Sequence, residues 1–451
     1  MRLAIALLIG AAAALLAATQ PISDTDLFWH LATGRETLAH GIVRTDLFSW
    51  TVRGTAVSTD QWLGQVVLYG AYGALDWWGV ALVRILSVGA LLVFVVLNAS
   101  AGRALRPLAV VLAVLPALVL TRVLWVDRPE LLGLVCFAVL LLLLRLGRDG
   151  DARALGGCVV VLAVWANLHG SFALGAVLVV VACIEGALRD VSRRSLYVAT
   201  ALLAVGATLL TPALLGTWTA PGFHFLSPPR DIQEWALIDV ATPLGIAYVV
   251  TLALLVIAAL AGPRPDTRVI VILVPVAFLS LTAARQAPLL AIAAAPLFAD
   301  RLDALLSARA SAPAPLGRAA SVFFALAAIL LIVAVGIAPR QPDERAFPVA
   351  ALTSLPNGDG TLNRYEWGGW LIWRAPQTPV FVDGRLTPYT NGVLEDYKLI
   401  ITAAPGWQDA LARRGVRTLL VSPTDPVAIR ATELGWSVRF RAPNVIVIAV
   451  R

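Results

Sequence analysis

The sequence predicts an all-α polytopic membrane bundle of about eleven spanning helices, followed by a small C-terminal α/β domain. Of the 451 residues, 59% are hydrophobic and only 14% are charged, whereas a soluble chain has about 25% charged residues. The apolar residues form runs of roughly 16 to 22, the length that crosses a hydrocarbon core about 30 Å thick. From about residue 340 charged and turn residues return. We therefore predict a transmembrane domain over 1–339 and a soluble domain over 340–451.

The apolar runs are separated by short gaps that carry most of the arginines. We predict spans at 3–20, 78–97, 107–121, 130–145, 154–170, 172–188, 196–215, 242–262, 269–284, 287–300 and 319–338. A long outer loop, 21–77, follows the first span. Residues 17–20, Ala-Ala-Thr-Gln, loosely resemble a cleavage site, so the first span is either a retained helix or a cleaved signal peptide.

The arginines predict the orientation of the bundle. One set of alternate gaps holds 14 arginines and the opposite set holds 7, although the 7 come from longer loops. Short cytoplasmic loops carry the excess of positive charge in membrane proteins. We therefore predict a multi-pass protein of the cell (inner) membrane, with a cytoplasmic N-terminus and an extracytoplasmic C-terminal domain. The net charge of +7 is nearly all arginine beside spans, and we predict no nucleic-acid partner.

Histidines and isolated acids gather on the outer face of this topology. They are His30, His40, His169 and His224, with Asp24, Asp26, Asp46, Asp60, Asp127, Glu130, Asp231 and Glu234. Ionisable groups beside or within spans are costly and commonly mark a functional site. We therefore expect the working site on the outer face.

An acidic pair, Asp24 and Asp26, begins the first outer loop. Ser23 or Asp24 can cap a helix, and on that helix Asp26 and His30 share one face because they are four residues apart. We predict that this helix lies at the membrane surface with its apolar side towards the lipid, namely Leu27, Phe28 and Leu31. The alternative is that the two acids only form a solvated helix cap.

Further polar residues of the outer loops are candidates for binding a donor phosphate or another part of a substrate. They are His30, Arg128, Asn167, His169, Glu234 and Arg285. Asn167 and His169 fall near the hydrocarbon boundary, where an unsatisfied polar group is costly, so their alternative role is a hydrogen bond between helices. Arg285 lies away from the cytoplasmic side and suits an anionic group such as a lipid phosphate.

Three motifs resemble those of a bacterial group of GT-C-like proteins, and the resemblance covers nearly the whole chain. The motifs are Asp-Thr-Asp-Leu-Phe-Trp-His-Leu-Ala-Thr-Gly at 24–34, Trp-Ala-Asn-Leu-His-Gly-Ser-Phe at 165–172 and Tyr-Glu-Trp-Gly-Gly-Trp-Leu-Ile-Trp at 365–373. GT-C glycosyltransferases are membrane enzymes that use sugars carried on polyprenyl phosphates. The resemblance implies a GT-C-like fold, with membrane lipids, a polyprenyl-phosphate-linked sugar and an acceptor of unknown kind as partners.

The C-terminal domain carries a second resemblance. Residues 366–370 and the segment 380–385 are similar to the Trp-Trp-Asp-Tyr-Gly region of oligosaccharyltransferase catalytic subunits, which helps to bind the acceptor peptide. Here Trp367 follows the acid Glu366 and glycines replace the tyrosine. The resemblance therefore implies an acceptor-side surface at Glu366, Trp367, Asp383 and Arg385, without implying peptide binding.

The resemblance also implies roles for the candidate residues. A carboxylate of the first outer loop, Asp24 or Asp26, would act as general base on the acceptor, or the two would hold Mg²⁺ or Mn²⁺, which prefer hard oxygen ligands. Arg128, His169 and Arg285 are candidates to stabilise the leaving phosphate.

The C-terminal domain has the alternation of a small α/β fold. We predict strands at 380–383, 416–421, 438–440 and 445–450, and helices at 392–403, 406–414 and 425–434. The domain has no histidine, no cysteine and no glycine-rich phosphate loop. We therefore expect it to pack over the outer loops rather than to bind a nucleotide.

Two other functions fit a protein of this kind: a non-catalytic glycolipid-binding scaffold and a lipid or polymer translocator. A translocator carries polar residues through the middle of the membrane to both faces. The predicted spans are nearly free of charge, with Arg84 and Glu185 as exceptions, and this favours the transferase.

Overall fold

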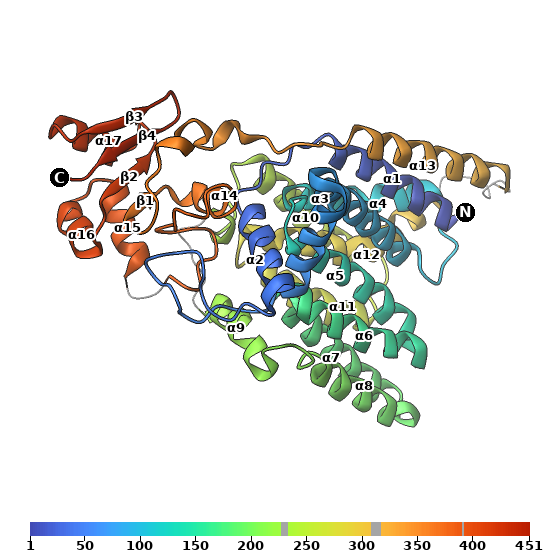
Figure 1. Ribbon diagram of the computed structural model, residues 1–451. Coiled ribbons are helices and arrows are strands. Elements are labelled where there is room, and N and C mark those ends of the chain that lie inside the picture. The colour runs from blue at the N-terminus through green and yellow to red at the C-terminus, as the bar shows by residue number, and fades with distance from the viewer. Residues whose placement is uncertain (227–232, 308–316, 390–391) are drawn as a thin grey trace. The chain divides into compact units, whose positions relative to one another are not determined.

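The computed structural model describes residues 1–226, 233–307, 317–389 and 392–451 (Figure 1). The prediction that concerns Asp231 lies outside the described residues, as does the side chain of His224. The chain divides into two compact units. The helical unit comprises Met1–Gln20 and Ala81–Pro339, and the mixed unit comprises Pro21–Val80 and Arg340–Arg451. Residues 21–80, which largely coincide with the predicted outer loop, thus cluster with the C-terminal residues.

In the described part of the chain, a helix lies at each of the eleven predicted spans. These helices are α1 (Arg2–Ala18), α3 (Trp62–Ser100), α4 (Pro107–Thr121), α5 (Pro129–Leu146), α6 (Ala152–Leu168), α7 (Phe172–Arg189), α8 (Arg194–Ala207), α10 (Pro243–Leu260), α11 (Thr267–Ser280), α12 (Ala287–Ser307) and α13 (Gly317–Ile337). Together with a short helix α9 (Thr219–Leu226) they confirm the predicted helical bundle. Among the described residues, six helical segments are long and apolar enough to cross a membrane, and α1, α6 and α11 are shorter apolar helices.

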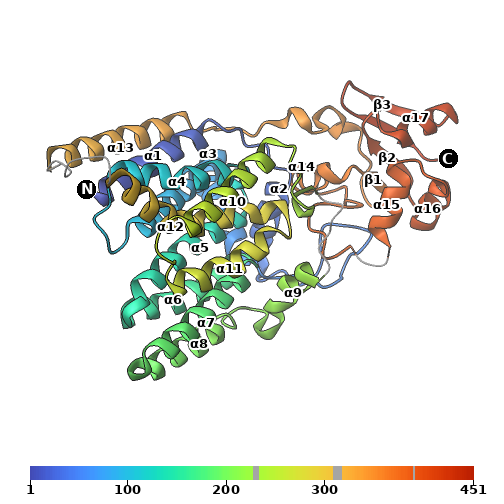
Figure 2. The ribbon, with the colours of Figure 1, turned by 180° about the vertical axis from the view of Figure 1, so that it is seen from behind.

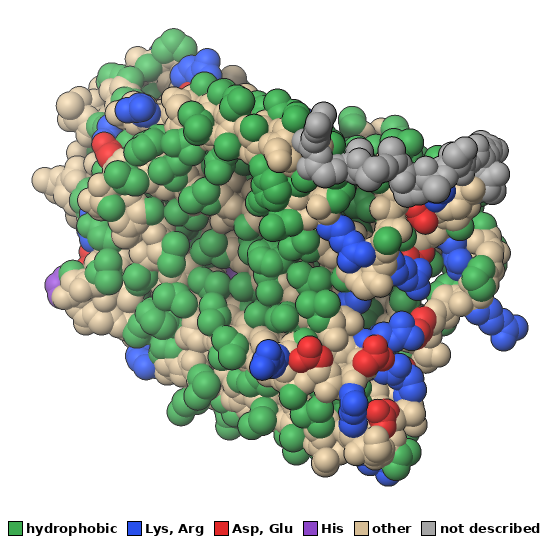
Figure 3. All heavy atoms as spheres, turned by 90° about the vertical axis from the view of Figure 1, so that its right-hand side faces the viewer, with side chains coloured by type: hydrophobic (Ala, Val, Ile, Leu, Met, Phe, Trp, Pro, Cys, Tyr) green, Lys and Arg blue, Asp and Glu red, His purple; other side chains and the backbone are tan. Residues whose placement is uncertain are grey.

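The helices of the helical unit pack as neighbouring pairs. Helix α1 lies along α13, α4 lies along α12, and α6 contacts α5, α7 and α8 (Figures 1 and 2). Large apolar side chains point outward, among them Leu202 of α8, Leu260 of α10 and Ile332 of α13. Figure 3 shows one face of the molecule on which hydrophobic side chains cover much of the surface, while Lys, Arg, Asp and Glu side chains gather in one part of it. Exposed apolar side chains on long helices suit a lipid environment.

Local sequence explains where several helices begin. Pro107, Pro129 and Pro243 stand at the first turns of α4, α5 and α10, where a missing N–H costs nothing. Asp151 caps α6 by accepting from two backbone N–H groups, and Asp266 caps α11 in the same way from one. These caps satisfy the orphan donors of a helix start.

Arg84 and Asp127 form a buried ion pair in the helical unit. Their side chains are 2% and 1% exposed, and Nη1 of Arg84 lies 2.6 Å from Oδ2 of Asp127. Nη2 of Arg84 also donates to the carbonyl of Gln20 at 2.7 Å. The pair therefore ties the end of α1, helix α3 and the segment before α5 together.

We expect Arg84→Met or Asp127→Leu alone to destabilise the protein by about 3–5 kcal/mol, because each leaves a buried charge without its partner. The double variant should recover most of that loss. Thermal unfolding of the full chain in detergent tests this. Arg53→Ala is the control, since Arg53 pairs with Asp359 at 2.8 Å with both side chains about half exposed, and such pairs contribute at most about 1 kcal/mol. A double variant less stable than either single one would contradict the role of the pair.

The mixed unit contains a four-stranded sheet and short helices. Its elements are α2 (Leu27–His40), the first part of α3, β1 (Thr361–Asn363), α14 (Gly368–Arg374), α15 (Val393–Ile401), α16 (Trp407–Arg414), β2 (Thr418–Val421), α17 (Pro426–Glu433), β3 (Val438–Arg441) and β4 (Ile446–Ala449). The strand order is β1-β2-β4-β3, with β1 parallel to β2 and the other pairs antiparallel. The predicted small α/β fold is confirmed, including three of its strands and its three helices.

The predicted strand at 380–383 was wrong, and the sheet instead uses β1. Val380 makes only an isolated bridge to Ser49. The side chain of Asn363 takes the place of a neighbouring strand, since its Oδ1 accepts from the N–H of Phe381 and its Nδ2 donates to the carbonyl of Val382, both at 2.8 Å. The segment is therefore held outside the sheet by the side chain of Asn363 and by main-chain hydrogen bonds between Val380 and both Phe48 and Trp50.

Helix α2 buries the apolar side that was predicted to face lipid. Leu27, Phe28 and Leu31 are all 0% exposed, and α2 packs against α14. The ring of Phe28 meets Phe347 at 5.2 Å and Trp77 at 5.8 Å between centroids. The apolar side of α2 therefore belongs to the core of the mixed unit.

Candidate active site

The two acids of the first outer loop have different positions in the structure. Oδ1 of Asp24 accepts hydrogen bonds from the N–H groups of Asp26 and Leu27, at 2.8 and 3.3 Å. Asp26 is the N-cap residue of α2, but its carboxylate makes no capping bond. Both acids are partly exposed. Asp24 therefore makes the capping bonds of α2, and the carboxylate of Asp26 does not cap this helix.

His30 lies one turn further along α2 and is buried, with 2% exposure. Its ring stacks on Trp29, with centroids 3.6 Å apart, and its Nδ1 lies 3.4 Å from Nε2 of Gln65. Asp26 and His30 are four residues apart at the start of α2, as the predicted shared face requires. His30, however, is buried inside the mixed unit. Its surroundings indicate a packing role.

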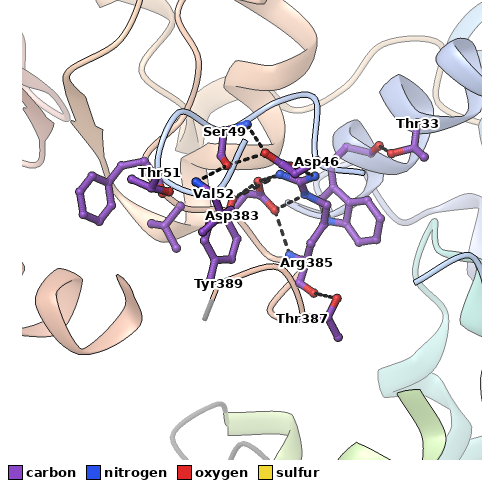
Figure 4. Close-up of polar contacts among 12 residues, drawn as sticks. Thr33, Asp46, Ser49, Thr51, Val52, Asp383, Arg385, Thr387 and Tyr389 are labelled. Atoms are coloured by element: carbon purple, nitrogen blue, oxygen red, sulfur yellow. Dashed lines mark hydrogen bonds and ion pairs between the residues drawn. The ribbon is translucent and has the colours of Figure 1, made fainter. Parts of the chain in front are cut away.

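A buried polar network surrounds Arg385 (Figure 4). Asp383 accepts from Nε and Nη2 of Arg385 at 2.8 and 2.6 Å, and Asp46 accepts from Nη1 at 2.5 Å. Tyr389 donates to Asp383 at 2.5 Å, and Ser49 donates to Asp46 at 2.6 Å. Fully satisfied networks of this kind fix one arrangement of the chain.

The surroundings of this network fix the protonation states of Tyr389 and Arg385. Burial, and then the charge of Asp383, raise the pKa of Tyr389 well above its usual value, so the phenol stays protonated and donates. Burial alone would lower the pKa of Arg385, but Asp383 and Asp46 hold it well above the usual value. The sequence pointed to Asp383 and Arg385 but missed the part that Tyr389 plays. For Asp46 the local signal was the spacing Asp-x-x-Ser to Ser49.

The predicted acceptor-side surface is only partly at the surface. Asp383 is 0% and Trp367 4% exposed, and the Arg385 side chain is 9% exposed, which contradicts a surface position for these three. Trp367 donates from Nε1 to the carbonyl of Ala346 at 3.0 Å. Glu366 alone of the four is open to solvent, with its side chain 55% exposed.

In the helical unit, Arg285 lies between two acids. Its guanidinium contacts Glu130, with Nη2 2.5 Å from Oε1, and Glu234, with Nη1 2.9 Å from Oε1. The ring of Trp235 lies 4.6 Å from Cζ of Arg285. Arg128 approaches the other oxygen of Glu234 at 3.6 Å. The structure thus brings the predicted residues Arg128, Glu234 and Arg285 together, and adds Glu130.

The position of His169 fits this cluster better than that of Asn167. Glu130 interacts electrostatically with His169 as well as with both arginines. The Nδ1 of His169 lies 2.8 Å from Oγ of Ser171 and accepts from its N–H at 3.2 Å. Nδ2 of Asn167 donates to two main-chain carbonyls, of Ala163 at 2.8 Å and of Leu210 at 2.9 Å. These bonds fit the alternative role for Asn167, which is a structural hydrogen bond rather than substrate binding.

Glu185 and Arg84, the two charged residues that interrupt the predicted apolar spans, are each paired. Glu185 of α7 accepts from Nε of Arg268 of α11 at 2.8 Å, and the two side chains are 8% and 9% exposed. Arg84 is paired with Asp127. Both charged residues that interrupt the predicted apolar spans, Arg84 and Glu185, therefore have an ion-pair partner.

The fit of a metal ion can be tested on the acids. Among the described residues, no group of three or more His, Cys, Asp or Glu side chains gathers in a way that could hold a metal ion. One oxygen of Asp24 is already engaged in capping. The residues present do not form a metal cage of their own, and an ion at Asp26 would need most of its ligands from substrate and water.

The apolar helices and the small sheet define a multi-pass membrane protein with a GT-C-like fold. Solved structures share this fold, and two of them are compared with the chain below. One is ArnT from Cupriavidus metallidurans in the apo state, with a TM-score of 0.55 and 14% identity, over 98% of this chain and 97% of that one. The other is the Archaeoglobus fulgidus oligosaccharyltransferase in complex with zinc and sulfate, with a TM-score of 0.51 and 11% identity, over 92% of this chain and 67% of that one. No family model and no curated protein sequence matches the chain.

Proposed function

We propose that this protein is a membrane glycosyltransferase that moves a sugar from a polyprenyl-phosphate donor to an acceptor on the outer face of the membrane. The observation that carries the proposal is that only one of the two loop acids caps helix α2. Asp24 caps α2 through its Oδ1, whereas Asp26 makes no capping bond at the same helix start. A carboxylate held at a helix start without a capping role suits general-base catalysis, and a solved structure of similar fold is an oligosaccharyltransferase.

In the proposed reaction Asp26 accepts the proton of the acceptor group as that group attacks the anomeric carbon of the sugar. The bond from that carbon to the donor oxygen breaks, and the polyprenyl phosphate leaves with the bonding electrons. The developing negative charge on the phosphate needs fixed positive charge or donors. Arg128 and Arg285 are proposed for that role, with His169 in support. A base in hydrogen-bond reach of the acceptor contributes about 10²–10⁴-fold to the rate.

The proposal includes the predicted orientation, with a cytoplasmic N-terminus and an extracytoplasmic C-terminal domain, because lipid-linked sugars used outside the cytoplasm require an outward-facing site. It does not depend on a metal ion. Mg²⁺ or Mn²⁺ held by Asp24 and Asp26 stays a prediction, to be tested by adding a chelator and then each ion separately.

The experiment that tests the proposal incubates the purified protein in lipid nanodiscs with a panel of polyprenyl-phosphate sugars and follows the appearance of free polyprenyl phosphate. We expect consumption of at least one donor, which increases when its acceptor is present. A translocator would instead move the lipid across proteoliposomes without consuming it. A scaffold would bind a donor and leave it intact. Either of the last two results would overturn the proposal.

The pairing of Glu234 leads to a prediction about donor binding. Its two oxygens face Arg285 at 2.9 Å and Arg128 at 3.6 Å, and its side chain is 37% exposed. A phosphate bound by both arginines would compete with this carboxylate. A hydrogen bond to a charged group is worth about 1.5–3 kcal/mol, so we expect Glu234→Gln to tighten the binding of polyprenyl phosphate about tenfold.

Binding of fluorescent polyprenyl phosphate to nanodiscs measures this effect. Glu366→Gln is the matched control, because it removes an exposed negative charge that lies far along the chain from the cluster. Arg128→Ala should weaken the binding. If Glu234→Gln leaves the affinity unchanged and Arg128→Ala does not reduce it, the cluster does not bind the donor phosphate.

A further inference from the structure

Gly384 of the mixed unit touches the carboxylate of Asp26. A Cβ atom built on Gly384 would overlap Oδ1 of Asp26 and would lie only 2.8 Å from its Cγ and 3.2 Å from its Oδ2. Real Cβ atoms essentially never come within 3.0 Å of another heavy atom, so the carboxylate would have to move. Gly384 does not have a positive φ, and its conformation is open to other residues. The absence of a side chain at position 384 therefore serves the close approach to Asp26.

A second glycine supports the same loop. A Cβ atom on Gly369, at the start of α14, would overlap the carbonyl oxygen of Thr25 and lie 3.1 Å from Cδ1 of Trp29. Two segments of the C-terminal sequence thus approach the Asp24-Thr25-Asp26 turn at van der Waals contact, one at the backbone of Thr25 and one at the carboxylate of Asp26. Any larger residue at either position would displace this turn.

The backbone at Gly384 is itself held on both sides. Asp383 and Arg385 belong to the buried network, and Oδ1 of Asp383 also accepts from the N–H of Arg385 at 2.9 Å (Figure 4). The residue after Arg385, Leu386, has a φ of 54°, a left-handed conformation that is costly for a branched side chain and is retained only where the surroundings impose it. The network therefore fixes the position of Gly384 against Asp26.

We propose that Gly384 is a positioning residue that holds the carboxylate of Asp26 in the orientation its base role requires. The proposal rests on the proposed function of Asp26. The ion network of Asp46, Asp383, Arg385 and Tyr389 acts through Gly384 and does not touch the substrate. The C-terminal segment, which has no histidine and no cysteine, would thus contribute to catalysis by positioning Asp26. A displacement of about 1 Å at a reacting group lowers the rate about 100-fold.

The test compares Gly384→Ala with Gly73→Ala. Gly73 lies in the first part of α3, has no atom within 4 Å of an added Cβ, and does not have a positive φ. We expect Gly384→Ala to fold, to keep the KM for the donor, to lose about 100-fold in kcat, and to shift the acid limb of the pH–rate profile. Gly73→Ala should match the wild type in each measurement.

An infrared difference spectrum of protein labelled with ¹³C-aspartate gives a readout that does not require turnover. The carboxylate band that disappears in Asp26→Asn identifies Asp26, and we expect Gly384→Ala to move that band. If Gly384→Ala does not fold, Tyr389→Phe replaces it as a milder change in the network, with the same direction of effect on the band and a smaller loss of kcat.

The outcomes separate the two proposals. The positioning role is overturned if the folded Gly384→Ala variant has the wild-type kcat and an unmoved band. The same holds for Tyr389→Phe when it replaces that variant. Either result leaves the proposed function intact. Full activity of Asp26→Asn overturns the base role instead. In that case a moved band would still report that Gly384 fixes the carboxylate.

Discussion

Asp26→Asn is expected to lower kcat by about 10²–10⁴-fold while the protein stays folded, because the amide cannot accept the proton of the acceptor. Asp24→Asn is expected to keep most of the activity. The oxygen of Asn can accept the same hydrogen bonds from the N–H groups of Asp26 and Leu27 that Asp24 accepts now, and Asn caps helices as well as Asp does. The measurement is the rate of donor consumption under saturating donor.

Asp24→Ala completes the comparison. It removes the cap, so we expect a loss of about 1 kcal/mol in stability and an activity that follows the amount of folded protein. The reverse pattern, an inactive Asp24→Asn beside an active Asp26→Asn, would show that the capping bonds do not identify the structural acid. Full activity in both variants would remove the acidic pair from the mechanism.

Asp383→Asn is expected to destabilise the protein by about 3–5 kcal/mol, because it leaves the buried guanidinium of Arg385 with one carboxylate in place of two. Asp383 is 0% exposed and accepts from Arg385 and Tyr389. Thermal unfolding of the full chain, followed by the near-ultraviolet signal, measures the loss. Asp383→Leu combined with Arg385→Leu should recover part of it, since buried ion pairs replaced by apolar residues are often tolerated.

Glu366→Gln is the matched control for this prediction. Its side chain is 55% exposed and lies 3.6 Å from Arg364, so we expect a change below about 1 kcal/mol. An acceptor-binding role for Asp383 leads to a different result, namely a stable Asp383→Asn variant with a raised KM for the acceptor. That result would contradict the structural role of the network.

Much of the fold could be predicted because long apolar runs leave few alternatives. Each predicted span coincides with a helix of the described chain, and the start of α5 at Pro129 and of α10 at Pro243 follows from the preference of proline for the first turn. The short strand β1, Thr361–Asn363, has only three residues and no alternation to reveal it. The segment 380–383 has the composition of a strand, but the side chain of Asn363 takes the main-chain hydrogen bonds of Phe381 and Val382 that a neighbouring strand would take.

The candidate site was less accessible to sequence reasoning. Asp24 and Asp26 are both suitable caps, and only the hydrogen bonds to Oδ1 of Asp24 distinguish them. Asp383 and Arg385 have the composition of a surface turn, and their burial depends on Asp46, which is 339 residues away from Arg385. The place of Gly384 beside Asp26 is also a contact between distant segments. Local patterns carry no information about such contacts.

The most direct test of the proposed transferase is the release of free polyprenyl phosphate by wild type and by Asp26→Asn, prepared and assayed side by side with the same donor panel. We expect the wild type to release the lipid from at least one donor and Asp26→Asn to remain at the background of protein-free nanodiscs. Equal release by the two proteins, or none by the wild type from any donor, would contradict a glycosyltransferase that uses Asp26 as its base.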